Sequence, residues 1–147
     1  MGKEVVPIHG RDHGPGGPDP IDVVLYIKVT ADASPLTTGD GQFVFEIGRD
    51  LNTTRLVEVE SYVTTVSSSG KPTVQLRNVT AAVDMLSTKV EIDASEKNSK
   101  DAATQPVINP ANSLVDWGDH IAIDVDVAGT GAKGLGVILT FAKGSGA

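Results

Sequence analysis

The stretch HIAIDVDV at residues 120–127 decides the fold class of this chain. Alternate side chains of a β-strand point to opposite faces of a sheet, so an apolar period of two predicts one buried and one solvated face. The expected buried face carries Ile121, Ile123, Val125 and Val127. Asp124 and Asp126 fall on the expected solvated face.

Seven further segments are β-branched or alternate in the same way. Phe43, Phe45 and Ile47 share one face of their segment, and Glu58 and Glu60 lie on the outer face of the next. Clusters of Gly, Pro, Ser and Asp separate the segments, as turns do. The expected strands cover residues 23–30, 42–47, 56–64, 73–79, 85–92 (one strand or a pair), 106–108 (a short edge element), 120–127 and 135–141.

About eight short strands at near-regular spacing predict an all-β fold, namely an antiparallel β-sandwich of jelly-roll type. Residues 93–104 are the one helical candidate. A single exposed helical turn and a loop both remain open for them.

The composition limits the classes of protein to which the chain can belong. Its 147 residues form one domain, or one domain and an arm, and its 16 glycines favour a loop-rich β protein. No cysteine is present, which excludes disulfides and cysteine-ligated metals. The net charge of −7 argues against direct binding of nucleic acid. No apolar run has the length of a membrane span or a secretory signal.

Residues 1–22 differ in composition from the rest, with four glycines and three prolines within residues 9–20. Proline removes amide donors and glycine raises the entropic cost of order, so we expect an extended attachment arm over residues 1–22. The sandwich domain is expected over residues 23–147. The arm residues expected to contact a partner are His9, Arg11, Asp12, His13, Pro15, Gly16, Gly17, Pro18, Asp19, Pro20 and Ile21.

The motif GTGAKG at residues 129–134 matches the G-x-G-x-x-G pattern of dinucleotide-binding proteins. That fingerprint needs a helix after the glycines, because the helix N-terminus binds the pyrophosphate. Here a strand is expected next. We therefore expect a glycine-rich hairpin and no cofactor.

His9 and His13, with Asp12 between them, have the spacing of a metal site, but residues i and i+4 share a face only on a helix. A metal held between copies of the arm and a stacking or hydrogen-bonding role against a partner both remain open. We assign no metal site.

Asp119, Asp124 and Asp126 suit acid–base chemistry or calcium binding by residue type. Acids opposite an apolar strand face are more often simply solvated. His120, at the start of a strand, is expected to be structural. We expect no catalytic residue and no enzymatic activity.

Trp117 is the only tryptophan and lies in an expected turn at residues 116–119. We expect it to close one end of the core. The alternative is a ligand surface, formed by Trp117 and Tyr62, on which sugars stack.

The run HGPGGPDPI at residues 13–21 resembles the H-x-P-G-G-x-D-P-(I/L) segment near the N-termini of small virion proteins of tailed bacteriophages, which are minor tail, fibre or head-associated proteins. The body resembles a small phage-type β-sandwich module in LTTGDG (36–41), VQLRNVT (74–80), DMLS (84–87), GDHI (118–121) and AGTGAKGL (128–135).

This resemblance implies a structural component of a virion, assembled in the bacterial cytoplasm. The arm would dock on other virion proteins of the head, collar or tail, and the sandwich would face outward as a homotrimer. The alternative is a module that binds a carbohydrate or host receptor. The resemblance implies no catalytic residues.

Overall fold

The computed structural model describes residues 22–143. The expectations for the arm residues from His9 to Ile21 fall outside the described residues. Strand β1 (Asp22–Lys28) begins at Asp22, one residue before the predicted domain boundary. The described residues form an all-β antiparallel sandwich, which confirms the predicted fold class.

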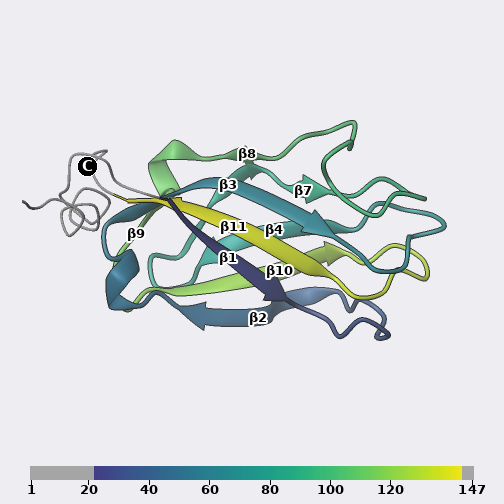
Figure 1. Cartoon of the computed structure of the whole chain (residues 1–147), viewed down its shortest axis with the longest axis horizontal. Coiled ribbons are helices and arrows are strands. Elements are labelled where there is room, and N and C mark those ends of the chain that lie inside the picture. The colour runs from purple at the N-terminus through teal and green to yellow at the C-terminus, as the bar shows by residue number, and fades with distance from the viewer. Residues whose placement is uncertain (1–21, 144–147) are drawn as a thin grey trace, which may run out of the picture.

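The first sheet has four strands in the order β1-β11-β3-β9 (Figure 1). Strand β11 (Gly136–Ala142) lies between β1 and β3 (Thr54–Tyr62), and it pairs antiparallel with both. Strand β9 (Leu114–Val115) adds two residues at the far edge.

The second sheet has the order β2-β10-β4-β5, with β7 also paired to β4. Its long strands are β2 (Gly39–Glu46), β10 (His120–Val127) and β4 (Thr73–Asn78). Strands β5 (Val83–Asp84) and β7 (Val90–Glu91) contribute two residues each. Strands β6 (Leu86–Thr88) and β8 (Val107–Ile108) form a separate pair.

The pairing follows the jelly-roll scheme. The first strand pairs with the last, the second with the last but one, and β3 with β9. Strands β1 to β4 alternate between the two sheets along the chain, and β9, β10 and β11 do so again. The chain is therefore one long antiparallel hairpin rolled into a sandwich, as in the double Greek key of jelly rolls.

The described residues hold eleven strands, so the expected number of about eight is too low. The additional strands lie between residues 83 and 115 and have two or three residues each. A strand of two residues is too short to show alternation in the sequence. These short strands are extended because neighbouring strands offer main-chain hydrogen-bond partners. Residues 93–104 form turns and bends, so this segment is a loop and not a helical turn.

The core lies between the inner faces of the two sheets. Strands β10, β11, β3 and β4 supply many of its largest buried side chains, among them Ile121, Ile123, Leu139, Phe141, Leu56 and Leu76. Full burial of a side chain of this kind contributes about 1.5–3 kcal/mol. Ile47 is also buried, whereas Phe43 and Phe45 are only partly buried against this core.

Val127 is 43% exposed, so its predicted place on the inner face is wrong. The register of β10 against β4 shifts between Val125 and Val127. A bulge of one residue changes the face on which the following side chain lies. The period of two therefore ends at Val125.

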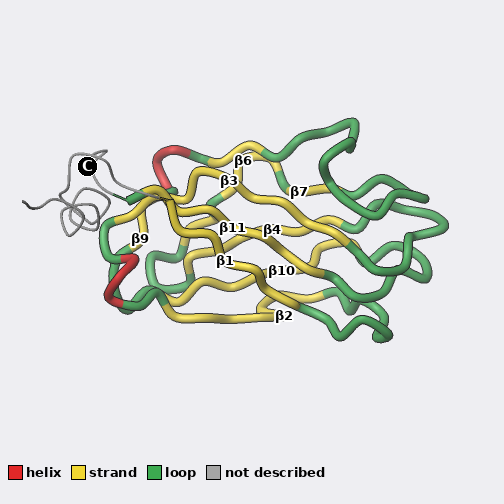
Figure 2. The backbone as a smooth tube through the Cα atoms, in the orientation of Figure 1, coloured by secondary structure: helices red, strands yellow, loops and turns green. Residues whose placement is uncertain are grey.

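The sandwich has two different ends (Figure 2). The terminal end carries Asp22, Ala142, the connections 47–53, 79–82 and 116–119, and the 3₁₀ turns η2 (Arg49–Leu51) and η3 (Pro110–Asn112). The opposite, loop end carries the longer connections 29–38, 63–72, 92–106 and 128–135.

Candidate functional site

The terminal end brings together the start of β1 and the end of β11, because Asp22 pairs with Ala142. On the other side of β11, Ala142 pairs with Arg55 of β3, and Arg55 pairs with Leu114 of β9. The chain thus enters and leaves the described sandwich on one sheet and at one end. A segment preceding β1 starts from this end.

Trp117 lies at the same end, in the turn that joins β9 to β10. The Trp117 amide donates to Asn52 Oδ1 at 2.8 Å, and the Gly118 amide donates to the Ile47 carbonyl at 2.8 Å. Gly118 has a φ of 96°, which favours glycine. These bonds fix the turn against η2.

The Trp117 side chain is 57% exposed, so the prediction that it closes the core is wrong. Leu51 of η2, 9% exposed, lies in the core at this end instead. The guanidinium carbon of Arg49 lies 5.3 Å from the centre of the Trp117 ring. This cation–π contact leaves an aromatic surface in solvent beside a positive charge.

Tyr62 lies at the loop end, where β3 finishes. Its ring occupies the space over Gly136 on β11, where a Cβ atom would collide with the ring. Lys28 Nζ lies 5.0 Å from the ring centre and 2.6 Å from Asp32 Oδ1. The hydrogen bond to Asp32 raises the pKa of Lys28. Tyr62 is therefore part of the packing of three strands.

Trp117 and Tyr62 do not share a surface. Thr54, at the start of β3, pairs with Val115 two residues before Trp117, and Tyr62 is eight residues further along β3. At about 3.3 Å per residue, the strand separates them by roughly 26 Å.

The carboxylates on and beside β10 are each held by a neighbouring group. Asp124 is 4% exposed and accepts two bonds from Arg77, at 2.8 and 3.1 Å, and one from the Gly41 amide at 2.6 Å. The bond to Asp124 raises the pKa of Arg77. Asp126 pairs with Lys89 at 2.7 Å.

Asp119 accepts from Asn78 Nδ2 and from the Asp116 amide, both at 3.0 Å, and His120 Nε2 lies 3.1 Å from Glu46 Oε1. No group of three His, Cys, Asp or Glu side chains suited to a metal occurs within residues 22–143. In that same range, no helix combines the length and apolar character needed to cross a bilayer.

The glycine-rich connection 129–134 leads into a strand, as predicted, but it is not a hairpin. It joins β10 of one sheet to β11 of the other. Gly129, Gly131 and Gly134 have φ values of 71°, 76° and 69°, so the glycines shape the crossing between sheets.

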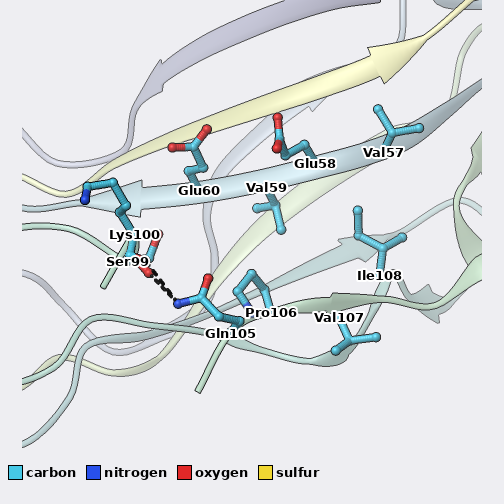
Figure 3. Close-up of a pocket in the computed structure, with 10 residues that line it drawn as sticks. All are labelled: Val57, Glu58, Val59, Glu60, Ser99, Lys100, Gln105, Pro106, Val107 and Ile108. Atoms are coloured by element: carbon cyan, nitrogen blue, oxygen red, sulfur yellow. Dashed lines mark hydrogen bonds between the residues drawn. The ribbon is translucent and has the colours of Figure 1, made fainter. Parts of the chain in front are cut away.

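A groove of about 570 Å³ runs beside β3 (Figure 3). Residues 57–60 form one wall, and residues 99–100 and 105–108 form the other. There Gln105 Nε2 donates to the Ser99, Lys100 and Ala102 carbonyls. Its walls combine apolar side chains with Glu58, Glu60 and Lys100. No sequence pattern indicates this groove, because its two walls lie about forty residues apart in the chain.

A comparison with protein-family models found no match to this sequence, and a search of curated proteins likewise found none.

Proposed function

We propose that this chain is a non-enzymatic structural protein of a bacteriophage virion. Its N-terminal segment attaches to the head, collar or tail, and its jelly-roll sandwich is displayed outward. The resemblance of residues 13–21 and of the body to tailed-phage virion proteins supplies the type of particle. It also supplies the homotrimer as the expected assembly.

The proposal rests on the difference between the two ends of the sandwich. The terminal end holds the paired residues Asp22 and Ala142, so the segment before β1 starts there. Trp117 and Arg49 are exposed at the same end. Tryptophan and arginine, with tyrosine, are enriched among the residues that contribute most of the binding energy of protein interfaces. The loop end lies at the opposite end of the sandwich and would face away from the particle.

The test is to delete residues 1–21, which leaves β1 whole. We expect the shortened chain to keep the circular-dichroism spectrum and melting temperature of the full chain, because the described core lies in residues 22–143. We also expect it to be missing from purified virions assembled in cells that supply it in place of the full chain.

A chain in which residues 1–21 are replaced by a Gly/Ser segment of equal length is the matched control for length. It should also fail to join the particle. Incorporation of either variant at the level of the full chain would contradict the proposed role of the arm.

The exposed Trp117 ring supports a second function, recognition of a carbohydrate on a host surface. Aromatic faces stack on sugar rings, and Arg49 beside the ring offers hydrogen-bond donors. Trp117→Ala should abolish binding on a glycan array and leave the melting temperature unchanged. An intact chain that binds no glycan on the array would exclude this function.

A further inference from the structure

Strand β1 is a long sheet edge, and no strand of the described residues pairs with its outer side. Within residues 22–143 it pairs with β11 alone, over seven residues and without a register shift. Its sequence, DVVLYIK, contains no proline and no glycine. An unprotected edge of this kind offers its main chain to another strand.

The other sheet edges in the described chain are less suited to pairing. Strands β9, β5 and β7 have two residues each. Strand β2 begins with Gly39 and Gly41 at positive φ, and its register shifts against β10. Short strands, bulges and charged side chains are usual protections of an edge. Strand β1 is neither short nor bulged, and its two charged residues, Asp22 and Lys28, stand only at its ends.

The hydrogen bond made by Val29, the residue after β1, shows which amides of β1 face β11 and which face the open edge. The Val29 amide donates to the Leu135 carbonyl at 2.9 Å in the same register that pairs β1 with β11. Main-chain groups alternate in direction along a strand. The amides of Leu25 and Ile27 therefore face β11, and those of Val24, Tyr26 and Lys28 face the open edge.

Apolar side chains accompany these unpaired amides. Tyr26 is 78% exposed and Val24 is 43% exposed on the outer face of the sheet. On the inner face, Val23 and Leu25 are only partly buried against the core. A strand added at this edge would cover side chains on both faces.

We propose that β1 pairs antiparallel with β1 of a second copy of this chain, about a two-fold axis at Leu25. In this register the open-edge amides of Val24 and Tyr26 bond the second copy, in agreement with the phase above. Asp22 lies opposite Lys28 of the second copy at both ends of the pairing. Val24 then faces Tyr26, Val23 faces Ile27, and Leu25 faces itself.

This register is the one that pairs all seven residues, and it is also the one that sets opposite charges against each other. Cross-strand pairs of opposite charge and of aromatic with β-branched residues both stabilise sheets. The two four-stranded sheets then become one sheet continuous through both copies. The inference does not depend on attachment to a virion, and it predicts a two-fold dimer in place of the expected trimer.

The experiment measures the mass of the full chain by sedimentation velocity from about 1 to 100 µM. We expect a dimer of twice 15.2 kDa. Asp22→Lys sets lysine against Lys28, and Lys28→Asp sets aspartate against Asp22, so each variant alone should dimerise about tenfold more weakly, as two pairs become repulsive. An equimolar mixture of the two variants restores opposite charges at both ends, so it should dimerise as tightly as the wild type.

Asp101→Lys is the matched control, since it makes the same charge change on a side chain that is 63% exposed. Asp101 lies in the connection 92–106, which contacts β3 through Ser99 and Ser61, and β11 lies between β3 and β1. The Asp101→Lys variant should leave the dimer unchanged. Lys28 also bonds Asp32, so Val24→Pro provides a second variant that removes an open-edge amide without altering charge; it should yield a monomer. A wild-type monomer or trimer would overturn the proposal, as would a mixture that stays as weak as the single variants.

Discussion

Gly134 sits where the chain crosses from one sheet to the other at the loop end. Its φ is 69°, and a Cβ atom would collide with Thr64 Oγ1 and lie 2.9 Å from the Asp32 carbonyl. Thr64 Oγ1 itself donates to that carbonyl at 2.7 Å. Three connections therefore meet at a point that has no room for a side chain.

We expect Gly134→Ala to lower the free energy of unfolding by roughly 2–5 kcal/mol, from left-handed strain and from the collision together. Gly131→Ala is the control, because its φ is 76° and no atom lies near its added methyl group. It should cost only the strain, about 1–2 kcal/mol. Urea unfolding of both variants gives the comparison, and equal losses would show that the collision is relieved without cost.

Asp124 shows how a strand face predicted to be solvated becomes buried. It is 4% exposed, and its carboxyl group accepts from Arg77 and from the Gly41 amide. Asp126, two residues later, has a side chain that is 31% exposed and pairs with Lys89. The two acids have the same sequence setting but different neighbours.

Asp124→Asn should therefore destabilise the fold by about 1–3 kcal/mol, because it leaves Arg77, itself partly buried, without its charged partner. Asp126→Asn on the same strand should cost less than about 1 kcal/mol, as exposed ion pairs do. Thermal unfolding at neutral pH measures both. Equal melting temperatures for the two variants would contradict the distinction.

At the scale of the element, β1 illustrates how an edge strand differs from a central one. Its amides alternate between bonds to β11 and the open edge. β11, which has strands on both sides, uses its main chain in both directions. A proline should therefore have opposite consequences at neighbouring positions of β1.

We expect Leu25→Pro to destabilise the chain by roughly 1–3 kcal/mol more than Val24→Pro, because only the Leu25 amide bonds β11. Hydrogen exchange in the wild type should show the same phase, with protected amides at Leu25 and Ile27. In a monomeric preparation, such as one at submicromolar concentration, the amides of Val24 and Tyr26 should exchange faster. Similar free energies of unfolding for the two proline variants would contradict the assignment of the Leu25 amide to β11 and of the Val24 amide to the open edge.

The long strands could be predicted from the sequence, because six to nine residues show the period of two. The strands of two or three residues could not, since their conformation comes from their partners in space. The same limit explains Trp117, whose side chain type suggested burial. The core at that end is filled by Leu51 of η2, which no local pattern connects with the turn at residues 116–119.

At the scale of the whole molecule, the jelly roll joins residues that are far apart in the chain. β1 pairs with β11 and β2 with β10, so the sheets close only when both halves of the chain are present. Folds dominated by such pairing refold in milliseconds to seconds. Closure of the long intervening segments must precede the contacts that stabilise it.

We therefore expect a chain that ends at residue 135 to lose cooperative unfolding, because β11 is the central strand between β1 and β3. A chain that ends at residue 143 retains β11 and is the control. Thermal denaturation followed by far-ultraviolet circular dichroism distinguishes the two. A cooperative transition in the shorter chain would show that the second sheet is stable without the first.

Alternation and turn residues act over a few neighbours, so the amino-acid sequence is enough to predict an all-β chain of short strands with a Gly/Pro-rich segment before them. Tertiary structure alone decided which strands are edges, that Asp124 is buried, that Trp117 is exposed beside Arg49, and that Tyr62 lies at the opposite end. These properties depend on residues tens of positions apart that meet only when the rolled hairpin closes. The open edge of β1 is also a property of the tertiary structure, because it depends on which strands of the described chain lie beside β1.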